Sequence, residues 1–213
     1  MAALSPKHPR GERTQRAILE AAEALFARRG FSGTRLEDVA EIVGIRRPSI
    51  LYYYPDKAQL YDAVLGDVLG GLLERVRGAL EAPGKLPERI EAAISAWVDY
   101  VAERPSLARL LLREVADGSA DEPPVLVRHT RPFLEMVGKV LERESSESLA
   151  SLRTVDPVQL ASTICGATVF LVAGMPALLP DLKLGPLSRQ QLEKHRDEVL
   201  AIARRLLPQR DAA

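Results

Sequence analysis

The segment from residue 30 to residue 57, GFSGTRLEDVAEIVGIRRPSILYYYPDK, constrains the fold more than any other part of the chain. Thr34 followed by Glu37 has the pattern of a capping box, which predicts that a short helix begins there. Gly44 predicts a sharp turn after that helix, because glycine adopts the left-handed backbone that helix ends require. A second short helix is expected to begin near Pro48, a good first-turn residue. Two short helices joined by a tight turn form a helix-turn-helix.

The side chains of this segment separate into an apolar inner face and a polar outer face. The expected inward residues are Leu36, Val39, Ala40, Val43 and Ile50. The expected outward residues around the second helix are Arg46, Arg47, Ser49, Tyr52 and Tyr53. Arginine can bind the edge of guanine, and serine and tyrosine hydroxyls can bind phosphate, so this face is expected to enter the DNA major groove. Arg35, beside the first helix, is a further candidate; an ordinary solvated face is the alternative interpretation of these arginines.

The net charge of the chain is zero, because 29 Lys and Arg balance 29 Asp and Glu. The balance differs along the sequence. Residues 1–60 contain ten basic and seven acidic side chains, a formal charge of +3, whereas residues 61–213 contain nineteen and twenty-two, a formal charge of −3. The N-terminal part therefore favours an anionic partner.

The rest of the chain is typical of an all-α protein. Helix formers dominate, aromatic residues make up only 5%, and no stretch alternates apolar and polar residues as a strand does. About nine helices are expected, at residues 14–29, 34–43, 48–54, 57–80, 87–103, 105–116, 123–149, 156–175 and 188–207. The expected domains are a flexible basic arm at 1–11, a helix-turn-helix DNA-binding domain at 12–56 and a larger helical domain at 57–213.

One uncharged stretch has the length of a membrane-spanning helix. Residues 157–180 contain no charged side chain, a length sufficient to cross a bilayer. The stretch is only weakly apolar, because it includes Gln159, Ser162 and Gly174, and charges of both signs flank it. A helix that protein covers on all sides has the same pattern. We expect a helix packed against protein, and no membrane partner.

Three stretches carry a resemblance to a known family. They are residues 13–31, RTQRAILEAAEALFARRGF; residues 34–45, TRLEDVAEIVGI; and residues 50–64, ILYYYPDKAQLYDAV. Here the chain resembles the tetracycline-repressor-like (TetR/AcrR) family of transcriptional regulators. The resemblance implies that the first three helices bind DNA and that helix 57–80 links them to a ligand-binding and dimerisation domain. It also implies phosphate contacts from Lys57 and from Tyr53, which replaces the usual histidine, whereas Leu51 departs from a common tyrosine.

The resemblance implies a sequence-specific DNA-binding transcriptional regulator. We expect a homodimeric repressor that leaves a palindromic operator when a small-molecule effector binds, with the identity of the effector left open. A dimer reads two half-sites and so gains the specificity that one helix-turn-helix lacks. The alternative is a small-molecule-binding helical protein without operator function.

The larger domain offers candidates for the effector pocket and for the dimer interface. By analogy with the family, large side chains between the fifth and eighth helices are pocket candidates, namely Trp97, Tyr100, Phe133, Met136 and Phe170, and plain core packing is their alternative. The last two long helices are expected to pair with their symmetry mates. The candidate interface residues are Ala161, Gly166, Ala167, Gly174, Leu192, Val199, Ile202 and Leu206.

The sequence contains no recognisable catalytic pattern. His8, His129 and His195 lie far apart, and Cys165 is the single cysteine. No glycine-rich phosphate loop or serine nucleophile elbow occurs. We therefore expect no enzyme activity, no metal and no cofactor. The first ten residues lack the apolar core of a signal peptide, which predicts a cytoplasmic protein.

Overall fold

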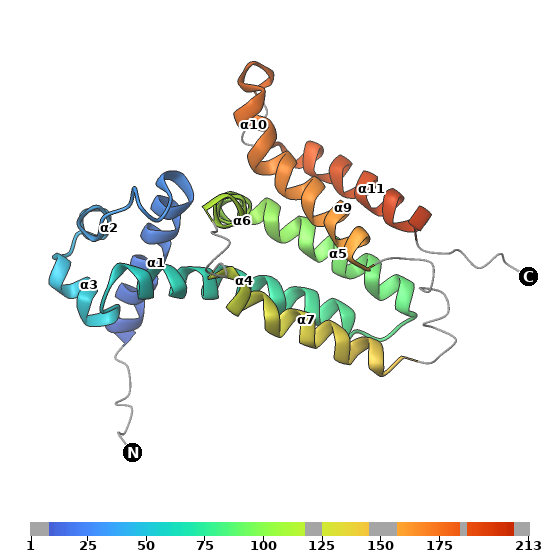
Figure 1. The fold of residues 1–213 in the computed structure, drawn as a ribbon, viewed down its shortest axis with the longest axis horizontal. Coiled ribbons are helices and arrows are strands. Elements are labelled where there is room, and N and C mark those ends of the chain that lie inside the picture. Colours follow the sequence, from blue (N-terminus) through green and yellow to red (C-terminus); the bar gives the residue numbers. More distant parts are fainter. Residues whose placement is uncertain (1–8, 118–124, 145–156, 184–186, 207–213) are drawn as a thin grey trace, which may run out of the picture. The chain divides into compact units, whose positions relative to one another are not determined.

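The computed structural model describes residues 9–117, 125–144, 157–183 and 187–206 (Figure 1). Within these ranges the regular structure is helical and contains no strand, which confirms the all-α prediction. The chain divides into two compact units, Met1–Val68 and Leu69–Ala213, here called the N-terminal and C-terminal units. The division falls inside one continuous helix, α4 (Lys57–Leu80).

The N-terminal unit contains α1 (Pro9–Arg29), α2 (Leu36–Val43), α3 (Arg47–Tyr53) and the first part of α4, coloured blue to cyan in Figure 1. The predicted start of the first helix at Thr14 is wrong, because α1 begins at Pro9. Proline suits the first turn of a helix, where its missing N–H has no partner to lose, and Glu12 in that turn complements the helix dipole. Residues 9–11 of the expected flexible arm are therefore helical, and residues 1–8 lie outside the described residues.

The core of the N-terminal unit is built from the apolar faces of all four helices. Fully buried members include Ile18, Phe26, Val39, Ile50, Leu60 and Leu65. Phe26 lies at the centre: its ring meets the ring of Tyr61 edge-on at 4.8 Å between centroids, and Phe31 lies 5.2 Å from Tyr61. This aromatic cluster packs the end of α1 against α4 and so fixes the frame that carries α2 and α3.

The expected capping box at Thr34 is wrong. The residue that precedes α2 is Arg35, whose backbone is extended and whose side chain makes no capping hydrogen bond. The Thr34 side chain is buried, and its hydroxyl donates to the Gly30 carbonyl at 2.8 Å. The physical reason is that a carbonyl just beyond the end of α1 needs a donor and lies within reach of this buried hydroxyl.

The C-terminal unit contains the remainder of α4 and the following elements: α5 (Leu86–Glu103), α6 (Ser106–Asp117), α7 (Leu126–Glu142), α9 (Pro157–Val169), the π-helical turn η1 (Phe170–Gly174), α10 (Met175–Leu178), the 3₁₀ turn η2 (Pro180–Leu182) and α11 (Arg189–Leu206). α9 contacts α5, α6 and α11. Figure 1 shows α9 in orange beside α5 in green and α11 in red. The helix expected at 123–149 is shorter in the described residues, since α7 spans 126–142 and the described residues on either side of it, 125 and 143–144, are not helical. Residues 118–124 and 145–156 lie outside the described residues.

The helix expected at residues 156–175 is interrupted, which corrects that prediction. α9 ends at Val169, and five residues of π-helix follow before α10. A Cβ atom added to Gly174 would lie 2.7 Å from the Phe170 ring. The ring therefore occupies space that only glycine leaves open, and the wider π turn accommodates this close approach.

The contact of α5, α9 and α11 forms one core cluster of the C-terminal unit, around Ile94, Ile164, Val199 and Ala203. Ile90, Trp97, Leu160 and Leu200 pack against this cluster. The expectation that Val199 faces a partner chain is wrong, because its side chain is only 2% exposed within one chain. Val199 and Ala203 lie one helical turn apart on α11 and face inward together.

The uncharged segment of α9, η1 and α10 is not buried by its own chain. Gln159–Leu178 has a mean hydropathy of 1.7, and 28% of it is buried within the chain. By length and composition this segment could cross a membrane, and it is the one such segment among the described residues. Its small residues Ala161, Gly166 and Ala167 are exposed. The expectation of a helix covered on all sides is therefore not met inside a single chain.

Candidate nucleic-acid interface

The turn between α2 and α3 has the geometry that glycine predicts. Gly44 adopts the left-handed conformation, with φ 73° and ψ 33°. Its N–H donates to the Glu41 carbonyl at 3.2 Å, and the Ile45 N–H donates to the Ala40 carbonyl at 3.0 Å. These bonds satisfy carbonyls at the end of α2. The chain then runs through the extended residue Arg46 into α3, so the predicted helix-turn-helix is confirmed.

α3 has one face in the core and one face in solvent. Ile50 is fully buried, and Tyr54 immediately after the helix is 6% exposed. The exposed side chains are Arg46, Arg47, Pro48, Ser49, Leu51 and Tyr52. Tyr52 is 83% exposed, an unusual value for an aromatic side chain. The sequence of α3, RPSILYY, contains no acidic residue, so its exposed face combines positive charge with apolar and hydroxyl groups.

Tyr53 differs from Tyr52 in its surroundings. It is half-buried, and its ring meets the Tyr52 ring edge-on at 5.1 Å. Its hydroxyl lies 3.6 Å from the position of a Cβ atom on Gly11, in the first turn of α1. Tyr53 therefore joins α3 to the start of α1, and its hydroxyl lies beside that turn.

Arg47 has a partner that the sequence does not predict. Its Nε lies 3.1 Å from a carboxylate oxygen of Glu37 on α2, and both side chains are more than half exposed. An exposed ion pair of this kind contributes little to stability, so Arg47 can exchange Glu37 for another acceptor at small cost. The pair joins the two helices across the turn at Gly44, a juxtaposition that no helical spacing signals. Arg35 and Arg46 are also exposed, each next to the start of a helix.

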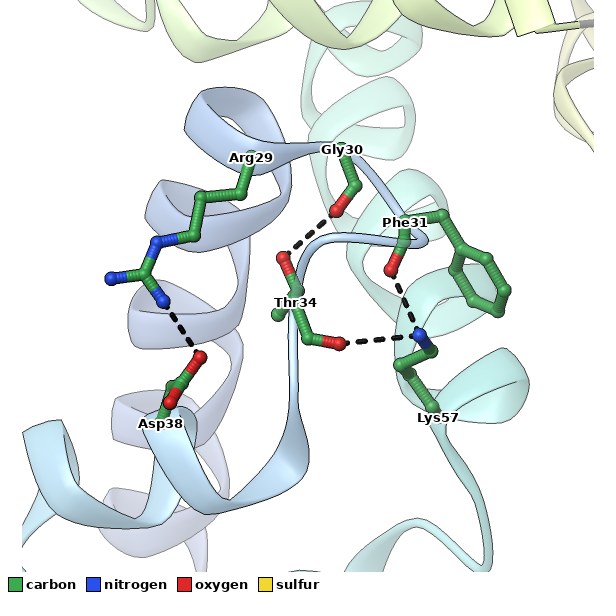
Figure 2. Close-up of polar contacts among 6 residues, drawn as sticks. All are labelled: Arg29, Gly30, Phe31, Thr34, Asp38 and Lys57. Atoms are coloured by element: carbon green, nitrogen blue, oxygen red, sulfur yellow. Dashed lines mark hydrogen bonds and ion pairs between the residues drawn. The ribbon is translucent and has the colours of Figure 1, made fainter.

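Lys57, the first residue of α4, points into the protein. Its ammonium donates to the Phe31 carbonyl at 2.9 Å and to the Thr34 carbonyl at 3.2 Å, as Figure 2 shows. The same group lies 4.3 Å from the centre of the Phe31 ring, within the range of a cation–π contact. The phosphate contact expected from Lys57 stays a prediction, and the free chain gives the ammonium these other partners.

Residues 18–64 match the family described as "Bacterial regulatory proteins, tetR family". The HTH-type transcriptional regulator RutR of Escherichia coli (strain K12) is 33% identical over 163 residues, which cover 72% of this chain and 71% of RutR. The chain belongs to the TetR family.

Two solved structures show the same fold as this TetR-family protein. The fatty acid degradation regulator FadR from Bacillus halodurans superposes with a TM-score of 0.70 at 16% identity, over 93% of this chain and 96% of FadR. AibR, solved in complex with isovaleryl coenzyme A and operator DNA, superposes with a TM-score of 0.67 at 19% identity, over 92% of this chain and 98% of AibR. The predicted family and fold are confirmed, with α1–α3 as the helix-turn-helix domain.

The predicted pocket residues of this TetR-family protein lie in different surroundings. Trp97 packs against the α5–α9–α11 core, and Tyr100 is 6% exposed. The Tyr100 hydroxyl accepts a hydrogen bond from the Arg104 guanidinium at 3.1 Å. Met136 is half-buried on α7, and Phe170 is 47% exposed. The side chain of Phe133 lies outside the described residues.

One polar contact in the C-terminal unit was not expected. The buried Thr168 hydroxyl donates to the Ile164 carbonyl at 3.0 Å and lies 3.1 Å from His195 Nε2. With the hydroxyl hydrogen directed to Ile164, the Thr168 oxygen can accept a hydrogen bond from Nε2–H in the tautomer that carries this proton. Burial lowers the pKa of His195.

Burial also raises the pKa of the Cys165 thiol to about 11. Among the described residues no three His, Cys, Asp or Glu side chains gather as a metal site would require.

Proposed function

We propose that this TetR-family regulator is a homodimeric repressor that binds a palindromic operator through α3 and leaves it when a small molecule binds. The observation that carries the proposal is the solvent-exposed face of α3, where Arg46, Arg47, Ser49 and Tyr52 lie together without an acidic residue in the helix. Arg46 and Arg47 would bind base edges, and Ser49 and Tyr52 would bind phosphate or sugar. Arg35 and Tyr53 are proposed as flanking contacts.

The domain assignment follows from this proposal. Residues 12–56 would form the DNA-binding domain, and residues 57–213 would bind the effector and the second protomer, with α4 as the link. We also propose that the protein is not an enzyme, since the family to which it belongs consists of regulatory proteins. A repressor acts where the chromosome lies, which places it in the cytoplasm.

Operator binding can be tested with genomic DNA fragments. The full-length protein should enrich and protect a small set of sites that contain an inverted repeat, with protection on two successive major grooves of one DNA face. The matched control is a double variant, Arg46→Ala with Arg47→Ala, which should enrich no site above random fragments. If the wild-type chain also enriches none, the protein is a small-molecule-binding helical protein without operator function.

We further propose that the exposed apolar face of α9, η1 and α10, together with the outer side of α11, pairs with a second copy. Ala161, Gly166 and Ala167 are exposed, as are larger apolar side chains nearby, namely Phe170, Leu178, Leu179, Leu182 and Ile202. Exposed apolar surface of this extent is typical of a protein interface. Gly174 and Leu192 remain proposed members of the interface, as does Leu206, whose side chain lies outside the described residues.

Sedimentation analysis should show a dimer at micromolar concentration. The proposed interface is expected to bury more than about 1,000 Å², as stable homodimers do. Gly166→Arg should shift the equilibrium to folded monomers. A Cβ atom at Gly166 would meet no other atom within 4 Å, so a side chain can begin there without a clash at Cβ in its own chain. A wild-type monomer at these concentrations, or a Gly166→Arg dimer of unchanged affinity, would contradict the proposed interface.

The effector is proposed to bind beside Trp97. The Trp97 Nε1 atom is buried and has no hydrogen-bond partner among the described residues, although buried polar atoms nearly always have one. A carbonyl acceptor on a ligand would satisfy it. AibR is solved with isovaleryl coenzyme A, so acyl-CoA thioesters are the first ligand class to test.

Trp97 is the single tryptophan of the chain, so tryptophan fluorescence reports on this residue alone. Titration with isovaleryl coenzyme A and with longer acyl-CoA thioesters should change the Trp97 emission saturably, while coenzyme A without an acyl group should not. The same thioester should release operator DNA. Unchanged emission with every member of the series would exclude acyl-CoA thioesters as ligands of this position.

A further inference from the structure

The connection between α1 and α2 is a tight, inward-facing turn. The Thr34 N–H donates to the Phe31 carbonyl at 3.3 Å, and the Thr34 hydroxyl donates to the Gly30 carbonyl. A Cβ atom at Gly33 would lie 2.5 Å from the Arg29 carbonyl oxygen, so the turn is folded closely against the end of α1. Such a turn has little freedom to move by itself.

The Lys57 ammonium lies between the Phe31 and Thr34 carbonyls of this turn, as Figure 2 shows. Two of the three N–H donors of its ammonium bind the Phe31 and Thr34 carbonyls. The Phe31 ring covers the same charge, and Phe31 itself packs on Tyr61 of α4. Without Lys57 two part-buried carbonyls would lose a charged donor, which is more costly than losing a neutral one.

The turn also determines where α2 begins. Thr34 lies two residues before the first residue of α2, and an ion pair between Arg29 and Asp38, at 2.6 Å, joins the end of α1 to α2. α2 in turn contacts α3. The first residue of α4 is therefore connected through the turn and α2 to the helix that presents Arg46 and Arg47.

We propose that Lys57 is a positioning residue, which locks the first turn of α4 to the α1–α2 connection and so holds the recognition surface of α3 in its DNA-reading geometry. The role differs from the phosphate contact predicted from the sequence. This positioning role rests on the proposed function, namely binding to operator DNA. Specific recognition requires base-reading side chains to be held within about half an ångström, whereas non-specific attraction to phosphate does not.

The test compares Lys57→Met with the wild type and with Arg46→Met, on operator DNA and on random duplexes of equal length. Methionine keeps the length of the side chain and removes the charge. Lys57→Met should lower the ratio of operator affinity to random-duplex affinity by roughly tenfold, while the slope of log affinity against log salt stays at the wild-type value. Arg46→Met is the control for the loss of a base-reading side chain, and it should lower the same affinity ratio with the slope unchanged.

The two roles for Lys57 give different results. A slope that flattens by about 0.9 in Lys57→Met identifies a phosphate contact and overturns the proposal. A lower melting temperature with an unchanged affinity ratio identifies a merely stabilising contact and also overturns it. If the wild-type chain itself does not distinguish operator from random DNA, the proposed function fails before any variant is compared.

A second measurement needs no variant and applies even if Lys57→Met does not fold. The wild-type protein without DNA is treated with an N-hydroxysuccinimide acetyl ester, and acetylation of each lysine is followed by mass spectrometry. Lys57 should react more slowly than the exposed Lys85 and Lys139, because its ammonium is engaged by two carbonyls. Acetylation of Lys57 at the rate of Lys85 would overturn the proposal.

Discussion

Phe26→Ala should lower the free energy of unfolding of the N-terminal unit by about 3–5 kcal/mol. Phe26 has no exposed surface, and its ring contacts both Tyr61 and Phe31 at the junction of α1 and α4. Alanine removes the buried ring and leaves a cavity that these aromatic neighbours can fill only in part. A loss of this size is a large fraction of the stability of an ordinary domain.

Urea denaturation followed by circular dichroism and by tyrosine fluorescence would measure the change. Phe26→Leu is the matched control, since it keeps most of the apolar volume and should cost less than about 1.5 kcal/mol. An alanine variant as stable as the leucine variant would show that the aromatic cluster is not the centre of the core. Operator binding by Phe26→Ala should fall with the fraction of folded protein, without a change in sequence preference.

The local features of the helix-turn-helix could be predicted from the sequence because each depends on neighbouring residues. The left-handed turn at Gly44 requires only glycine after an apolar helix, and α2 ends there. The start of α4 follows from Asp56, whose carboxylate accepts the Gln59 N–H at 2.7 Å. Side chains that cap or end a helix act within three or four residues, so a sequence window contains all the partners.

The contacts of Thr34, Glu37 and Lys57 could not be predicted in the same way. Thr34 fits a capping box, yet a buried carbonyl at Gly30 competes successfully for its hydroxyl. Lys57 lies 26 residues from Phe31 along the chain, and only the folded unit brings them together. A lysine at the start of a helix beside a DNA-binding surface can point into solvent or into the protein. The sequence pattern is the same in both cases.

In the C-terminal unit, too, the sequence does not predict which partner an apolar side chain contacts. Periodicity correctly indicates that α11 has an apolar side, but not whether that side meets α5 and α9 or a second chain. Val199 meets the core, whereas Ile202 is 37% exposed on the same helix. The π turn at Phe170 also leaves no periodic signal, because it depends on the close approach of one ring to Gly174.

Arg47→Ala and Arg46→Ala should each weaken operator binding by about 1–3 kcal/mol, with little change on random DNA. Both side chains are exposed at the start of α3, where recognition helices contact base edges. The partner of Arg47 adds a further expectation. Glu37→Gln should leave Arg47 free of its ion pair and strengthen binding to random DNA, since a carboxylate beside the phosphates is repelled.

Fluorescence anisotropy at several salt concentrations measures these affinities. Arg189→Ala is the matched control: Arg189 is exposed and paired with Glu193 at 2.8 Å, as Arg47 is with Glu37, but it lies on α11 in the C-terminal unit. Its removal should leave operator affinity within about 0.5 kcal/mol of the wild type, as expected for a surface residue away from the interface. If Arg46→Ala and Arg47→Ala behave like Arg189→Ala, α3 enters the groove in a different register, with Ser49, Leu51 and Tyr52 towards the bases.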